Sequence, residues 1–111
     1  MPDDDLTFQF AESQDALTIQ LKGALTLDTR PLFEDIVLPR VDAMGTRPVT
    51  LDLGQVHYID SAGLGVLVMV HSKRQRAGAP LLFRVSEAVY KIMELSRLVR
   101  YLKIEVVSSS A

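Results

Sequence analysis

The chain has 111 residues, of which 48% are hydrophobic and 23% charged, and it contains no cysteine and no tryptophan. This length and composition are typical of one globular domain and exclude a disordered chain, while the longest apolar stretch, residues 62–70, is far shorter than the roughly 20 residues of a membrane-spanning helix. The lack of cysteine excludes a disulfide framework and a thiolate metal centre, and two histidines argue against a histidine-based one. We therefore expect no metal, no cofactor and no insertion into a membrane.

The charges are distributed unevenly along the chain. The net charge is −2, but residues 1–60 carry 11 acidic and 4 basic side chains and residues 61–111 carry 3 acidic and 8 basic ones. This asymmetry indicates either a polarised binding surface or two halves that neutralise each other on packing, and we favour the second. A pI of about 5.6 argues against a nucleic-acid partner. The acidic N-terminus is unlike a secretory signal, which predicts a cytoplasmic protein.

The first half of the chain changes from a period of two to a helical period. Apolar and polar residues alternate over 6–10 and 17–21, which predicts two strands joined as a hairpin. From Asp28 or Thr29 to about Met44 the apolar spacing is helical, and Gly45 is a typical stop. We expect Pro39 to kink or end this helix, because proline has no N–H to donate.

The second half alternates strands with helices. A third strand is predicted at 49–53, a short connection at 54–60, and then a helix from 62 to about 76, buried over its first half. The basic residues Lys73, Arg74 and Arg76 are expected to be solvated at the end of this helix, where its dipole favours cations.

Two more strands and a helix complete the chain. Residues 81–85 and 102–106 are expected to be strands, and Ser86 is expected to cap a helix between them. The buried side of that helix is predicted to comprise Val89, Ile92, Met93 and Val99.

The resulting order is β-β-α-β-α-β-α-β. Right-handed crossovers make the later strands parallel, so we predict an α/β fold with one mixed, mostly parallel sheet of about five strands and helices packed against it. All 111 residues are expected to form one domain, with residues 1–5 and 108–111 flexible. Such a scaffold does not by itself specify an activity.

The most informative segment is residues 58–65, Tyr58 and Ile59 followed by the hexapeptide Asp60, Ser61, Ala62, Gly63, Leu64, Gly65, where a loop after a strand enters a helix. Either Asp60 or Ser61 can cap the helix. Each glycine costs a helix about 1 kcal/mol relative to alanine. We therefore expect the glycines to serve either close internal packing or the approach of a partner, beside free N–H groups that favour an anion.

This hexapeptide resembles the Asp-Ser-(Ser, Thr or Ala)-Gly-Leu-Gly signature of STAS domains in bacterial anti-sigma factor antagonists, where the serine is the phosphoacceptor. Chain length and element order agree with that family. The resemblance implies that Ser61 is phosphorylated, and that the unphosphorylated protein binds an anti-sigma factor that is also a serine protein kinase. Phosphorylation would end this binding and a serine phosphatase would restore it. The protein would then regulate transcription as a binding partner, a monomer or weak dimer, and not as an enzyme.

The sequence departs from the family pattern in two places. Family members commonly carry Gly-Glu-Leu-Asp after the second strand, and the matching residues 23–26 here are Gly-Ala-Leu-Thr. Asp28 either replaces the missing acids in part or caps the first helix. We expect partner binding to involve Thr26 and Asp28 together with the hexapeptide, Asp60, Ser61, Ala62, Gly63, Leu64 and Gly65. The Thr-Gly-Leu of the family is Ser-Arg-Leu at residues 96–98, and we do not carry over nucleotide binding.

Other interpretations of Ser61 are weaker. A serine hydrolase would need His57 or His71 as the base, and the Gly-x-Ser-x-Gly pattern of such enzymes is absent. The Gly63–Gly65 pair lacks the third glycine of a dinucleotide loop. Within STAS domains, the alternatives are a scaffold subunit of a stress-signalling complex and a cytosolic accessory subunit of a lipid or anion transporter. The presence of Ser61 favours partner binding controlled by phosphorylation, whereas the missing acidic residues at positions 24 and 26 favour these alternatives.

Overall fold

The computed structural model describes residues 5–107, except for the side chains of residues 98 and 99. The elements along the chain are β1 (Leu6–Glu12), β2 (Leu17–Leu25), α1 (Arg30–Asp42), β3 (Val49–Ile59), α2 (Ser61–Arg76), β4 (Leu81–Ser86), α3 (Glu87–Leu95), the 3₁₀ turn η2 (Leu98–Tyr101) and β5 (Ile104–Val107). This order confirms the prediction. The expected flexibility of both chain ends concerns residues that, apart from Asp5, lie outside the described range.

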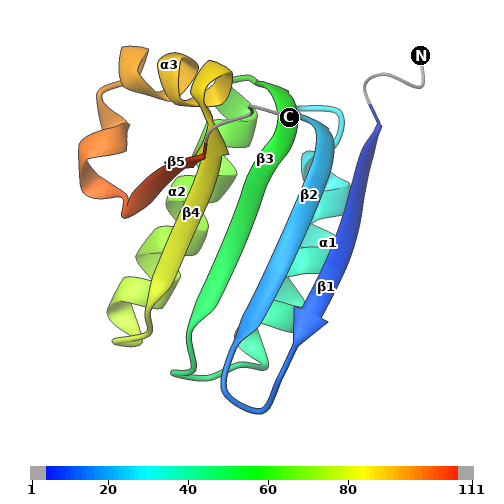
Figure 1. Cartoon of the computed structure of the whole chain (residues 1–111), viewed down its shortest axis with the longest axis vertical. Coiled ribbons are helices and arrows are strands. Elements are labelled where there is room, and N and C mark those ends of the chain that lie inside the picture. Colours follow the sequence, from blue (N-terminus) through cyan, green and yellow to red (C-terminus); the bar gives the residue numbers. More distant parts are fainter. Residues whose placement is uncertain (1–4, 108–111) are drawn as a thin grey trace.

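The five strands form one sheet in the order β1-β2-β3-β4-β5, with β1 antiparallel to β2 and every other pair parallel. Helices α1 and α2 lie on the same face of this sheet (Figure 1). Ile19, Leu51 and Phe83 lie side by side on β2, β3 and β4 and are fully buried. Residues one step along each strand point to the opposite face, which is polar. The core therefore lies between the sheet and its helices.

Strand β3 is longer than predicted, because residues 54–59 belong to it and are not a connection. Its pairing with β2 shifts twice, between Gln20 and Lys22 and between Gly23 and Ala24, and each shift adds one residue to β3. The buried residues Leu53, Val56 and Ile59 consequently recur every three residues. Alternation of apolar and polar residues therefore does not predict this part of the strand. With these residues included, β3 extends to Ile59, directly before Asp60.

Helix α1 continues through Pro39 to Asp42, so of the two expected effects, a kink or an end of the helix, the second is wrong. The proline removes the hydrogen bond to the carbonyl of Asp35, four residues earlier. Both residues are exposed, so the carbonyl that loses its partner lies on an exposed side of the helix, where the loss costs least.

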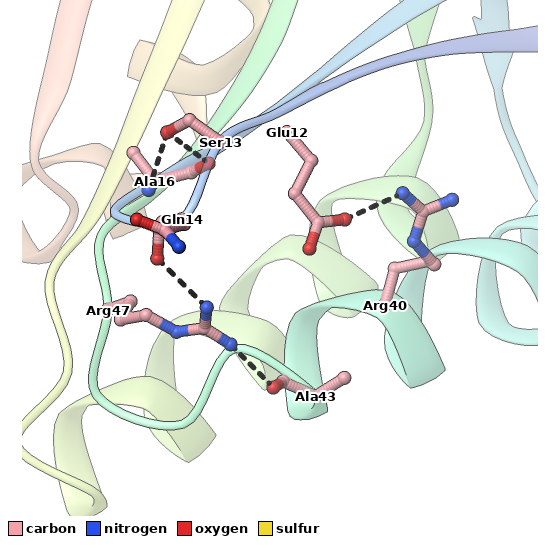
Figure 2. Close-up of polar contacts among 7 residues, drawn as sticks. All are labelled: Glu12, Ser13, Gln14, Ala16, Arg40, Ala43 and Arg47. Carbon is pink, nitrogen blue, oxygen red and sulfur yellow. Dashed lines mark hydrogen bonds and ion pairs between the residues drawn. The ribbon is translucent and has the colours of Figure 1, made fainter.

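The turn between β1 and β2 is fastened to the end of α1, as Figure 2 shows. Arg40 Nη2 donates to Glu12 Oε1 at 3.0 Å. Arg47 Nη1 donates to the carbonyl of Gln14 at 3.0 Å, and its Nη2 donates to the carbonyl of Ala43 at 3.1 Å. These contacts lie at the opposite end of the sheet from the start of α2 (Figure 1). The end at which α2 starts is not involved in them.

Arg74 is buried, with 5% of its surface exposed, so the expectation that it is solvated is wrong. Its guanidinium donates to the carbonyls of Gly45 (2.7 Å), Arg47 and Pro80 (3.0 Å). Burial lowers the pKa of Arg74, an effect that the nearby Asp42 carboxylate opposes. The side chain thus joins the loop after α1 to the loop after α2.

Within residues 5–107, two ion pairs connect the acidic and the basic half of the chain. Lys73 Nζ lies 3.3 Å from Asp42 Oδ2, and Arg84 Nη1 lies 3.8 Å from Asp52 Oδ2. Packing therefore brings opposite charges of the two halves together, as the favoured interpretation of the asymmetry requires.

The cap of α3 is as predicted, because Ser86 Oγ accepts a hydrogen bond from the N–H of Val89 at 3.2 Å. The helix ends at Leu95, however, and the positive φ of Arg97 (63°) separates it from η2. Val99 therefore belongs to η2 and not to the helix, which corrects the prediction. Met93 is fully buried, as expected of a core residue.

Candidate functional site

Asp60 caps helix α2. Its backbone is extended and its Oδ1 accepts a hydrogen bond from the N–H of Gly63 at 2.9 Å. Ser61 is the first residue of the helix, and it is exposed. Within residues 5–107 no partner is found for its hydroxyl group. Ser61 is therefore not needed as a cap and is accessible from solvent.

The other carboxylate oxygen of Asp60 holds the loop between β2 and α1. Oδ2 accepts from the N–H of Leu27 at 3.0 Å, and the N–H of Asp60 donates to the carbonyl of Leu25 at 3.2 Å. Burial opposes ionisation of this carboxyl, but the N–H groups of Gly63, Leu27 and Ala62 together outweigh burial and hold its pKa below the usual value. Thr26 and Asp28, on either side of Leu27, are thereby brought beside the hexapeptide.

The same loop is fixed from inside by Thr29, which the sequence analysis missed. The Thr29 hydroxyl is buried, accepts from the N–H of Thr26 at 2.8 Å and donates to the carbonyl of Ala24 at 2.8 Å. Thr29 occupies the N-cap position of α1, so the alternative in which Asp28 caps this helix is wrong. Asp28 is exposed, and its side chain has no polar partner within the described residues.

The two glycines of the hexapeptide have different surroundings. A Cβ on Gly63 would lie 2.1 Å from the carbonyl oxygen of Leu25 and 2.9 Å from Cγ1 of Ile59, so the start of α2 packs directly on the strand ends. A Cβ on Gly65 would meet only Nη1 of Arg30, at 3.7 Å, which is an ordinary contact. Internal packing explains Gly63 and leaves Gly65 unexplained.

The hexapeptide divides into a buried and an accessible part. Gly63 and Leu64 are buried, whereas Ser61 is exposed and Ala62 and Gly65 are half-buried. Two residues with exposed apolar side chains adjoin this segment, namely Leu27 (69% exposed) and Tyr58 (49% exposed). The N–H of Leu27 donates to Asp60, and Tyr58 precedes Asp60 by two residues. Tyr58 belongs to the segment that the sequence indicates, whereas Leu27 does not.

The histidines do not adjoin Ser61. His57 is four residues earlier on extended β3, about 13 Å away, and His71 is ten residues later on α2, about 15 Å along the axis. Neither can activate the Ser61 hydroxyl as a hydrolase base. Among residues 5–107 no three histidine, aspartate or glutamate side chains are grouped to hold a metal ion. None of the helices in this part of the chain is long and apolar enough to cross a membrane.

Comparison with known proteins places this geometry in a family. Residues 8–106 match the family model described as "Mlab, STAS domain". Among solved structures, an anti-sigma factor antagonist from Mycobacterium paratuberculosis has a TM-score of 0.75 at 17% identity, over 91% of this chain and 86% of that one. The protein TM1081 from Thermotoga maritima has 0.74 at 24%, over 93% and 88%. The Bacillus cell-fate determinant SpoIIAA in its phosphorylated form has 0.67 at 13%, over 93% of both chains.

At these identities the solved structures show a shared fold, while the family model covers nearly the whole chain. The chain therefore belongs to the STAS domain family and has the fold found in anti-sigma factor antagonists.

Proposed function

We propose that this protein is an anti-sigma factor antagonist whose partner binding is controlled by phosphorylation of Ser61. The observation that carries the proposal is the exposed, unpartnered Ser61 hydroxyl in a first turn that Asp60 caps independently. The unmodified protein binds an anti-sigma factor that is also a serine protein kinase, and a serine phosphatase reverses the modification. SpoIIAA, with which this chain shares its fold, is known in phosphorylated and unphosphorylated forms.

The local electrostatics suit a modification that leaves the fold intact. A phosphate carries about −1.5 to −2 charges, and the dipole of α2 favours it at the N-terminus by about 0.3 to 1 kcal/mol. The neighbouring Asp60 carboxylate opposes it, since two unit charges about 5 Å apart repel by about 1 to 3 kcal/mol at dielectric constants of 80 to 20. The repulsion exceeds the dipole term by up to about 3 kcal/mol, which is less than the roughly 5 to 15 kcal/mol by which a typical domain is stable.

A phosphate would also oppose a complex. Leu27, whose N–H donates to the Asp60 carboxylate, and Tyr58, three residues before Ser61, have exposed side chains. A partner that binds over Ser61 would force a phosphate at this position to lose its water. A penalty of about 1.4 kcal/mol already weakens binding tenfold. Phosphorylation can therefore end the complex while the domain stays folded.

The test is recovery of partners from the native cell by tagged wild-type protein, Ser61→Ala and Ser61→Asp. We expect the wild type and Ser61→Ala to retain a kinase-like anti-sigma factor, and Ser61→Asp to lose it at least about tenfold. Ser72→Ala, which changes a half-buried serine further along α2, is the matched control and should bind as the wild type does. Equal partner recovery by Ser61→Asp and the wild type, with no kinase among the partners, would refute the proposal.

A second candidate is a permanent binding subunit, either of a stress-signalling complex or of a lipid or anion transporter. It is favoured by the lack of acidic residues at positions 23–26, where Ala24 is buried and points into the core. In this case the same surface, with Leu27 and Tyr58, binds its partner whatever the state of Ser61. Recovery of transporter or scaffold subunits by all three proteins would select this alternative.

A further inference from the structure

Arg30 is a basic residue at the N-terminus of a helix, where acidic residues are usually preferred. It is the first residue of α1, where the helix dipole disfavours a cation, and the first turn of α1 contains no acidic residue. The other basic residues of α1 and α2 are all in last turns, where the dipole favours them: Arg40, Lys73, Arg74 and Arg76. A cation at an N-terminus calls for an anion nearby.

The present partner of Arg30 holds it weakly. Its Nε lies 3.4 Å from Oε2 of Glu34, one turn further along α1, and a third of each side chain is exposed. Exposed pairs of this spacing contribute only about 0.3 to 0.5 kcal/mol. The guanidinium can therefore exchange Glu34 for a stronger anion at little cost.

Arg30 also faces the first turn of α2. The C-terminal ends of β2 and β3 are adjacent, with Leu25 paired to Ile59. Helices α1 and α2 therefore begin at the same end of the sheet (Figure 1). Nη1 of Arg30 lies 3.7 Å from the position of a Cβ on Gly65. No side chain therefore lies between Nη1 of Arg30 and this position of α2, where a methyl group would also fit.

Ser61 lies on the same face of α2, four residues before Gly65. Side chains with this spacing have Cβ atoms about 5 to 6 Å apart, so Nη1 of Arg30 is within about 10 Å of the Cβ of Ser61. A phosphoryl group extends outward from Oγ, and the long arginine side chain can turn toward it. These two movements close the gap without a change of the backbone.

We propose that Arg30 receives the phosphate on Ser61 and leaves Glu34 when it does so. This inference rests on the proposed phosphorylation of Ser61. A phosphate offers more charge than a carboxylate and accepts two parallel N–H bonds from a guanidinium. The exchange frees the carboxylate of Glu34, so that modification at the start of α2 also changes the charge that α1 presents to a partner.

The experiment uses full-length protein in which phosphoserine is incorporated at position 61 during translation, so that no kinase is needed. Titration by ³¹P NMR measures the second pKa of the phosphate, which is about 6 when unperturbed. We expect this pKa to be at least about half a unit lower in the wild type than in Arg30→Gln, because a nearby cation favours the dianion. Glu34→Gln, which removes the competing carboxylate, should lower the pKa further.

Arg40→Gln is the matched control, because Arg40 pairs with Glu12 at the opposite end of α1. It should leave the phosphoserine pKa unchanged. The ¹⁵N resonance of Arg30 Nε in the wild type provides a second measurement that needs no variant, and it should move when position 61 carries phosphate. Equal pKa values in the wild type and Arg30→Gln, or an unmoved Arg30 resonance, would overturn the contact. Neither result depends on a native kinase, so the phosphorylation switch itself is tested separately.

Discussion

The carboxylate of Asp60 accepts the main-chain N–H of Leu27 at 3.0 Å, across 33 residues of sequence. With its other oxygen it caps α2. One side chain thus sets both the start of the helix that carries Ser61 and the loop that carries Thr26 and Asp28. The accessible surface around Ser61 consists of two segments whose relative position depends on this residue.

Replacement of Asp60 should destabilise the domain and loosen this loop. We expect Asp60→Ala to lower the free energy of unfolding by about 1 to 2 kcal/mol, because it removes a helix cap and a second main-chain acceptor. Urea denaturation measures this change. Asp28→Ala, which removes an exposed acid of the same loop, should stay within about 0.5 kcal/mol of the wild type. Equal effects of the two substitutions would contradict this role of Asp60.

The contribution of Asp60 should depend on pH. Its pKa is lower in the folded protein than in the unfolded chain, so its ionised form stabilises the fold above the unfolded value of about 3.9, and this stabilisation is lost as the pH falls through the folded value. Asp60→Asn keeps the shape without the charge. The gap in unfolding free energy between the wild type and Asp60→Asn should therefore shrink between pH 7 and pH 3. A gap that is constant over this range would argue against the main-chain N–H groups as the cause.

The two glycines of α2 should respond oppositely to alanine. Gly63→Ala places a Cβ 2.1 Å from a main-chain oxygen, and we expect it to cost about 3 kcal/mol or more. Gly65→Ala has room for the methyl group and should raise stability by up to about 1 kcal/mol through helix propensity. Thermal unfolding measures both. Partner binding by a folded, stabilised Gly65→Ala protein should nevertheless be weaker if a partner approaches this turn, and a destabilised Gly65→Ala would show that the chain itself requires the glycine.

Arg74 should be required for stability although it lies on a basic helix end. Arg74→Met leaves the carbonyls of Gly45, Arg47 and Pro80 without this donor, and we expect a loss of about 3 kcal/mol or more. Arg76→Met, two residues further along and exposed, is the control and should change stability by less than about 0.5 kcal/mol. Chemical denaturation separates the two. Similar stabilities would mean that the buried hydrogen bonds contribute little.

The parts of the fold that alternate or repeat with a regular period were predictable, and the parts set by single contacts were not. In the core row, Ile19 and Leu51 follow from alternation, and Phe83 follows from a continuous apolar run at 81–83. The C-terminal end of β3 could not be predicted from alternation, because two bulges make its buried residues recur every three residues. Nor does periodicity distinguish Arg74, which reaches three distant carbonyls, from its solvated neighbours.

The candidate site was predictable to a similar degree. The hexapeptide indicates Ser61 and a helix cap at either Asp60 or Ser61, because a cap and its helix are local in sequence, and the structure assigns the cap to Asp60. The roles of Thr29 and Leu27 depend on how the end of β2 packs beside the end of β3. The same is true of the difference between Gly63 and Gly65, which only the neighbouring atoms reveal.

We propose Ser61 as the residue whose phosphorylation controls partner binding. Intact-mass spectrometry of the protein purified from its own cell, followed by mapping of the modified residue, is the decisive measurement. We expect a population with a single phosphate, located on Ser61 and lost in Ser61→Ala. A protein that carries no phosphate under any condition in which its partners are active, or carries it on another residue, would show that Ser61 is not the phosphoacceptor.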